Sequence, residues 1–86
     1  MSLEILRKKI DQIDQEMLTL FESRMQIVKE IGLFKKQHQM SILDQDREKE
    51  VLQSRVDQLI NQELRPHYTS FVKHLMEISK AYQNDL

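Results

Sequence analysis

The sequence predicts an all-α fold with three helices per chain, the first of them very long, arranged as an intertwined homodimer. The 86 residues include only one glycine and one proline, whereas sheets, tight turns and phosphate-binding loops need more of both. Apolar residues recur in steps of three and four, which is the spacing of one face of a helix. A chain of this length forms one domain, which we expect to cover residues 1–86.

The longest apolar pattern predicts a helix from Leu3 to Gln37. Ser2 suits the N-cap position, and Glu4 places a negative charge in the first turn, where it complements the helix dipole. The apolar positions follow a heptad spacing, and we call them the seam: Leu3, Leu6, Ile10, Ile13, Met17, Leu20, Ile27, Ile31 and Phe34.

This helix is too long for one small domain. At 1.5 Å per residue it extends for roughly 50 Å, while a globular domain of this size is only about 30 Å across. The seam therefore needs a second chain to cover it, most simply another copy. We expect an obligate homodimer.

Two shorter helices complete the predicted fold. The second begins near Asp44, with Asp44 or Ser41 as its cap. Its apolar residues are Val51, Leu52, Val56, Leu59 and Ile60. A polar connection over residues 61–65 leads to Pro66, which suits the first turn of the third helix. The apolar residues of that helix are Tyr68, Phe71, Val72, Leu75, Met76 and Tyr82.

Composition excludes several classes of function. Thirteen basic and fourteen acidic residues give a net charge of -1, so no basic excess is available to bind nucleic acid or a membrane surface. The absence of cysteine excludes disulfides and thiolate metal sites. The three histidines lack the spacing of a metal site. The first residues do not resemble a signal peptide or an anchor, so we expect a cytoplasmic protein.

Three cations on the first helix are candidates for binding an anion. Arg24 occupies a seam position between Leu20 and Ile27. A guanidinium there needs an anionic partner, either a carboxylate in a structural ion pair or a bound ligand, unless the side chain extends to solvent at the edge of the core. Lys35 follows eleven residues later on nearly the same face, so a doubly anionic ligand could lie between the two. Arg7 precedes Arg24 by roughly 25 Å of helix. It could reach the same site only from an antiparallel second copy, and is otherwise an ordinary surface arginine.

Polar groups on the shorter helices form a second candidate set. Asp44, Arg47 and Glu48 share one helical face, either as a cap with a local ion pair or as a carboxylate, steadied by Arg47, that accepts a ligand hydroxyl. Ser79 and Gln83 share a face of the third helix, as a polar pair or as ligand-binding groups.

The order and spacing of these residues resemble the all-α (type II) chorismate mutases. The similarity begins at residues 6–14 (LRKKIDQID) and continues through Arg24, residues 28–32 (VKEIG) and Lys35. It extends to residues 44–48 (DQDRE) and to the pair Ser79 and Gln83. The resemblance thus covers nearly the whole chain.

The resemblance implies an isomerase that rearranges chorismate to prephenate in phenylalanine and tyrosine biosynthesis, without metal or cofactor. It also implies two equivalent pockets in a homodimer, each completed by an arginine from the long helix of the other chain. By this resemblance, Arg24 and the partner's Arg7 pair with the substrate carboxylates. Lys35 and Gln83 donate to the ether oxygen, and Glu48 accepts from the ring hydroxyl. The binding shell is completed by Asp44, Arg47 and Ser79.

Two alternatives remain open from the sequence. An isochorismate-pyruvate lyase shares this fold and similar cations, but eliminates pyruvate from the isomeric substrate. A non-catalytic helical dimerisation module would leave Arg24 in the seam as a buried ion pair.

Overall fold

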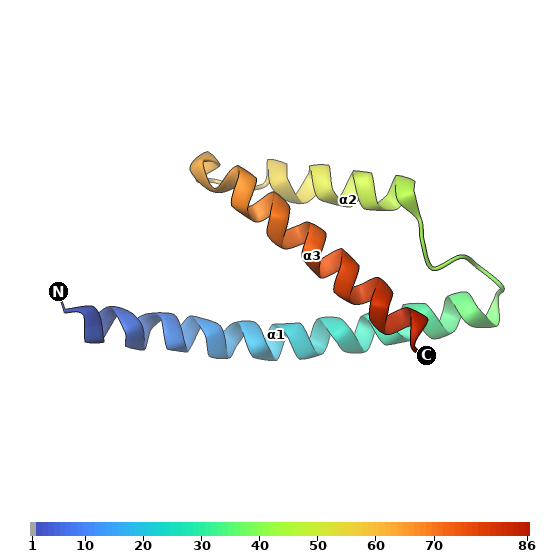
Figure 1. The fold of residues 1–86 in the computed structure, drawn as a ribbon, viewed down its shortest axis with the longest axis horizontal. Coiled ribbons are helices and arrows are strands. Elements are labelled where there is room, and N and C mark those ends of the chain that lie inside the picture. Colours follow the sequence, from blue (N-terminus) through green and yellow to red (C-terminus); the bar gives the residue numbers. More distant parts are fainter. Residues whose placement is uncertain (1) are drawn as a thin grey trace.

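The computed structural model describes residues 2–86 and confirms the all-α prediction (Figure 1). The elements in chain order are α1 (Leu3–Gln37), α2 (Gln45–Asp57), the short 3₁₀ helix η1 (Gln62–Leu64) and α3 (Arg65–Asn84). No strand occurs within this described range. The long helix therefore has the bounds that the apolar pattern predicts.

Local capping explains where the helices begin. The Ser2 hydroxyl accepts a hydrogen bond from the backbone N–H of Ile5 at 3.2 Å, and the Asp44 carboxylate accepts one from the backbone N–H of Arg47 at 3.0 Å. Each bond satisfies a backbone donor that has no partner within its helix. Pro66 lies in the first turn of α3, as predicted.

The position of Ile60 differs from the prediction. It was expected on the apolar face of the second helix, but α2 ends at Asp57 and Ile60 is fully exposed in the following loop. The Asn61 side chain accepts from the backbone N–H of Glu63 at 3.1 Å and begins η1. At the end of α2, the backbone N–H groups of Gln58 and Leu59 bond to carbonyls only three residues earlier. This tighter turn closes the helix, so the apolar spacing extends beyond the end of α2.

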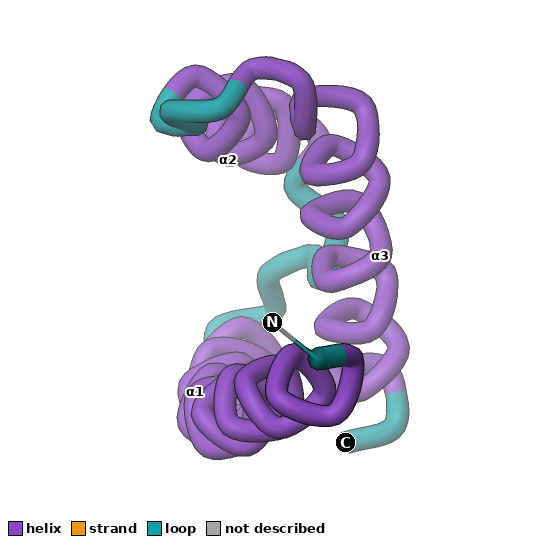
Figure 2. The backbone as a smooth tube through the Cα atoms, turned by 90° about the vertical axis from the view of Figure 1, so that its left-hand side faces the viewer, coloured by secondary structure: helices purple, strands orange, loops and turns teal. Residues whose placement is uncertain are grey.

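The third helix connects the other two. In the described range, α3 packs against both α1 and α2, while α1 and α2 do not pack against each other. Figure 1 shows α3 crossing from the end of α2 to the C-terminal half of α1. Figure 2 shows α1 and α2 apart, at opposite ends of α3. The N-terminal half of α1 projects beyond this assembly (Figure 1).

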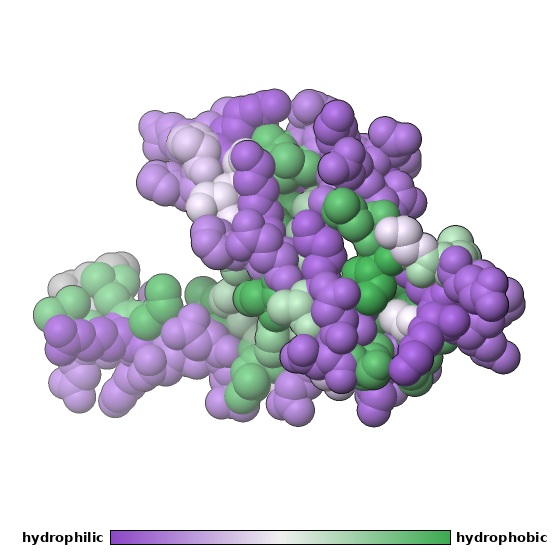
Figure 3. All heavy atoms as spheres, turned by 45° about the vertical axis from the view of Figure 1, so that its right-hand side comes forward, coloured by the Kyte–Doolittle hydropathy of each residue, from purple (hydrophilic) through white to green (hydrophobic). Residues whose placement is uncertain are grey.

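A single chain buries very little. Its buried apolar residues are Val28, Val56 and Val72, and no large side chain among residues 2–86 is fully buried. Every residue from 2 to 24 is exposed. All members of the seam lie between 44% and 69% exposed. Figure 3 shows apolar side chains along the projecting part of α1.

The dimensions describe the same open shape. The chain measures 55 × 25 × 15 Å with a radius of gyration of 16.0 Å, against about 12 Å for a compact domain of this length. Its accessible surface is 7214 Å², against about 5,400 Å² for a compact protein of this mass. The excess of about 1,800 Å² is surface that a globular monomer would have buried.

None of the helices in the described range is long and apolar enough to cross a membrane.

Candidate active site

Arg24 joins α1 to α3 through Ser79. One guanidinium nitrogen, Nη1, donates to the Ser79 hydroxyl, and that hydroxyl donates to the backbone carbonyl of Leu75 at 2.7 Å. Ser79 is buried. Arg24 itself is exposed in the single chain, since nothing covers the seam beside it, so the expectation that it points into a core is not met within one chain. No carboxylate in the described range pairs with it. A guanidinium has five donors, so others remain for an anion.

Gln83 forms a second connection between the same helices. Its amide Nε2 donates to the backbone carbonyl of Val28 at 3.0 Å. Gly32 lies one turn further along α1 and is buried. A Cβ at this position would lie 2.9 Å from Gln83 Cγ and 2.9 Å from Leu86 Cδ1. The glycine therefore allows α3 to approach α1 closely enough to place Gln83, which compensates for its low helix propensity.

Gly32→Ala is expected to displace Gln83 and to lower stability. Alanine contributes about 1 kcal/mol of helix propensity, while overpacking of this kind costs about 1–3 kcal/mol. We expect a net loss of up to about 2 kcal/mol in the free energy of unfolding, measured by denaturant titration at fixed chain concentration.

The matched variant for this test is Gly32→Ala combined with Gln83→Ala, which removes the crowded Cγ. Stability should partly recover in the double variant. A single Gly32→Ala variant more stable than the wild type by about 1 kcal/mol, the full gain in helix propensity, would show that the close approach at Gly32 has no energetic consequence.

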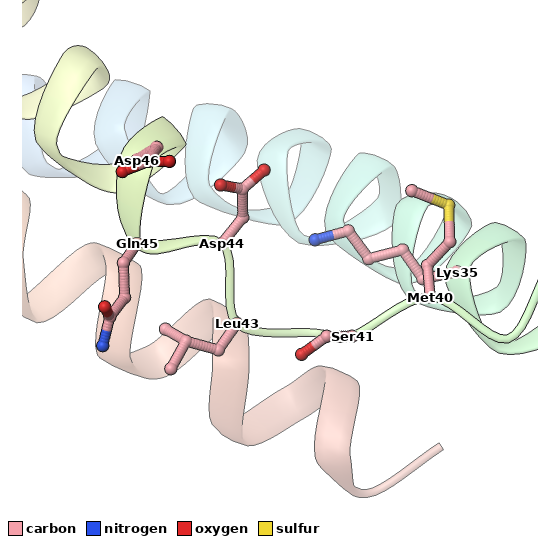
Figure 4. A pocket seen from close by; sticks show the side chains of 7 residues that line it. All are labelled: Lys35, Met40, Ser41, Leu43, Asp44, Gln45 and Asp46. Carbon is pink, nitrogen blue, oxygen red and sulfur yellow. The ribbon is translucent and has the colours of Figure 1, made fainter.

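Lys35 lies beside the loop that connects α1 to α2. Its ammonium donates to the backbone carbonyl of Ile42 at 3.0 Å. Figure 4 shows the side chain running along this loop, with the ammonium on the side of Asp44. The hollow here has a volume of ≈ 470 Å³, and its lining residues are Lys35, Met40, Ser41, Leu43, Asp44, Gln45 and Asp46. The structure thus brings Lys35 and Asp44 together.

Glu48 pairs with a residue that its spacing in the sequence does not indicate. One carboxylate oxygen, Oε1, lies 2.8 Å from the ammonium of Lys80 on α3. The expectation that Arg47 steadies Glu48 is wrong, because the Arg47 guanidinium instead lies 3.5 Å from Glu50. The i, i+4 spacing on α2 indicated a shared face, but only the packing of α3 on α2 reveals Lys80 as the partner.

Arg7 lies apart from the other candidates. It is exposed on the projecting half of α1, roughly 25 Å from Arg24 along the helix.

The remaining groups do not share one cavity among residues 2–86. Arg24 lines an apolar hollow with Phe71 and Leu75, while Glu48 borders another between α2 and α3. A single chain therefore brings Arg24 to Ser79 and Lys35 to Asp44, and leaves the other candidates separate on an open surface.

Comparison with known proteins identifies the family. The family model for chorismate mutase type II matches residues 6–84. The chain belongs to the chorismate mutase type II family. All eight candidate residues lie within the matched range.

Two known proteins are similar to this chain. A 54-residue stretch, 63% of the chain, is 39% identical to the T-protein of Haemophilus influenzae, and covers 14% of the length of that protein. A solved structure of a conserved hypothetical protein from Pyrococcus furiosus superposes with a TM-score of 0.72 at 34% identity, covering 94% of this chain and 93% of that one. The fold of this chorismate mutase family member therefore occurs in a chain of similar length.

Proposed function

We propose that this chain is an isomerase that converts chorismate to prephenate, a step of phenylalanine and tyrosine biosynthesis. The observation that carries the proposal is the family match over residues 6–84, which includes every candidate site residue. The pairs Arg24–Ser79 and Gln83–Val28 support it, because both fix polar groups of α3 against α1.

This reaction requires binding and electrostatics more than acid–base chemistry. The rearrangement is concerted, so it needs no nucleophile. It requires a flexible dianion to be held in a compact conformation, which removes much of the entropic part of the barrier. It also requires donors aimed at the ether oxygen, where negative charge develops as the bond breaks.

The proposed residues can supply these interactions. Arg24 and the partner's Arg7 bind the two carboxylates, with Ser79, Asp44 and Arg47 completing the shell. Lys35 and Gln83 donate to the ether oxygen, and Glu48 accepts from the ring hydroxyl. A lysine ammonium carries three donors and a glutamine amide two, so the bonds to Ile42 and Val28 leave donors for the substrate.

We also propose that two copies of the chain intertwine through the seam of α1. The excess surface of about 1,800 Å² per chain lies within the range that obligate homodimers bury per partner. An antiparallel arrangement of two α1 helices would bring the N-terminal half of one helix, with Arg7, beside Arg24 of the other.

Sedimentation equilibrium measures this assembly directly. We expect a dimer mass down to the lowest chain concentration at which helical circular dichroism persists, because the seam has no other cover. A folded monomer that retains its helical signal would contradict the dimer.

The proposed activity is tested with the purified chain and chorismate. We expect chorismate to disappear with stoichiometric formation of prephenate, followed by proton NMR, and no pyruvate from isochorismate in a parallel reaction. Pyruvate release from isochorismate alone would identify a lyase. A folded dimer that acts on neither substrate, and binds neither in calorimetry, would support a dimerisation module instead.

Gln83→Glu is expected to make activity strongly dependent on pH. The wild-type amide donates at every pH, since it does not titrate, so we expect a nearly flat profile of kcat/KM from weakly acidic to weakly alkaline pH. A glutamate donates to the ether oxygen only when protonated, and the ordinary pKa of glutamate is about 4.3. Activity of the variant should therefore persist on the acidic side and fall as pH rises.

A profile of kcat/KM against pH for both proteins provides the measurement. Gln83→Met, which cannot donate at any pH, is the matched control and should be weakly active throughout. An unchanged profile in folded Gln83→Glu would show that residue 83 does not face the ether oxygen.

A further inference from the structure

We propose that Lys80 is a positioning residue: it holds the carboxylate of Glu48 in place to accept a hydrogen bond from the ring hydroxyl of the substrate. This inference rests on the proposed function, in which Glu48 receives that hydroxyl.

The ion pair between Lys80 and Glu48 is the most protected in the described range. The charged atoms are 2.8 Å apart, and the two side chains are 32% and 28% exposed. The other pairs, Lys8–Glu4, Arg47–Glu50 and Arg65–Asp57, are all more exposed. Because exposed pairs are screened by water and gain little, this pair is the one best able to restrain its members.

The pair also spans two helices. Glu48 lies in the first turn of α2, and Lys80 lies near the end of α3. The nearer cation in sequence, Arg47, is directed to Glu50. Lys80 is therefore the cation that contacts Glu48, and it ties the hydroxyl acceptor on α2 to α3.

One turn of α3 then carries three groups of the proposed site. Ser79 accepts from Arg24, Lys80 follows it directly, and Gln83 lies three residues beyond Lys80, on a neighbouring position of the helix surface. A rigid helix thus fixes the carboxylate-binding arginine, the hydroxyl acceptor and the ether-oxygen donor relative to one another.

The ammonium of Lys80 has a second effect, on the binding of the dianionic substrate. An ionised Glu48 alone would repel a dianionic substrate, since like charges at short range disfavour each other most where water is excluded. The positive charge of Lys80 offsets that repulsion. Glu48 can then act as an acceptor without opposing the approach of the two substrate carboxylates.

The test compares two rigid bicyclic dicarboxylates that share the compact shape of the transition state, one with the ring hydroxyl and one without it. Dissociation constants come from calorimetry on the whole dimer. We expect the wild type to favour the hydroxyl form by about 10- to 100-fold, the range for hydrogen bonds to a charged group. In Lys80→Met this preference should fall by about tenfold, because Glu48 is no longer held.

Three further proteins make the result specific. Lys80→Arg keeps a cation in reach of Glu48 and should retain most of the preference. Lys73→Met removes the same charge from the same helix, at a residue lining a hollow with Glu48, and should retain it too. Lys80→Gln, of similar length and polarity, takes the place of Lys80→Met if the latter loses its helical circular dichroism.

The outcomes separate this inference from the proposed function. A folded Lys80→Met or Lys80→Gln that keeps the wild-type preference would overturn the positioning role, as would an equal loss in Lys73→Met. A wild type that binds neither dicarboxylate and leaves chorismate unchanged would overturn the proposed function, and this inference with it.

Discussion

Replacing Arg24 with alanine is expected to lower kcat/KM for chorismate by at least about 10²- to 10³-fold, the effect of removing one donor from a preorganised charge-stabilising site. The guanidinium bonds to Ser79 and has donors left for a carboxylate. Alanine removes both interactions. Arg24→Lys should recover only part of the activity, since an ammonium cannot form the paired bonds of a guanidinium.

The matched control for this variant is Arg55→Ala. Arg55 is an exposed arginine in the last turn of α2, away from the candidate residues. Steady-state kinetics on the three proteins, with helical content checked by circular dichroism, provides the measurement. Activity within about twofold of the wild type in folded Arg24→Ala would exclude a direct role in binding the substrate.

Replacing Arg7 with alanine is expected to cause a loss of similar size, about 10²-fold or more in kcat/KM. The reason is less evident from one chain, because Arg7 is exposed and roughly 25 Å from Arg24 along α1. In the proposed dimer, the partner's Arg7 completes each pocket. The loss should therefore appear both as a weaker affinity for dianions and as a lower kcat.

Lys9→Ala provides the control for Arg7. Lys9 is also an exposed cation on the same turn of α1, so its removal changes the charge of the helix without removing the proposed contact. Equal activities of Arg7→Ala and Lys9→Ala dimers would show that Arg7 has no special role.

Most of the fold could be predicted because its determinants are local. Ser2 and Asp44 cap their helices through bonds within three residues, and Pro66 marks a helix start. Apolar spacing gave the length of α1. The same spacing failed at Ile60, because α2 already ends at Asp57 in a tighter turn whose backbone bonds span three residues. A periodic apolar pattern carries no information about where the backbone bonding changes.

The site was harder to predict wherever two helices meet. The shared face of Ser79 and Gln83 follows from helical geometry. Lys80 could not be identified as the partner of Glu48, because 32 residues of sequence separate them and only the packing of α3 on α2 joins them. Arg47 was the nearer cation, and proximity in sequence was misleading there.

Mixing the two inactive homodimers tests most directly the claim that two chains build each active site. After subunit exchange between Arg24→Ala and Arg7→Ala, each heterodimer contains one pocket with both defects and one with neither. We predict that each heterodimer regains about half of the wild-type activity per dimer, as this symmetry requires. If mass spectrometry confirms exchange and no activity returns, Arg7 does not act across the interface, and the proposed shared site is wrong.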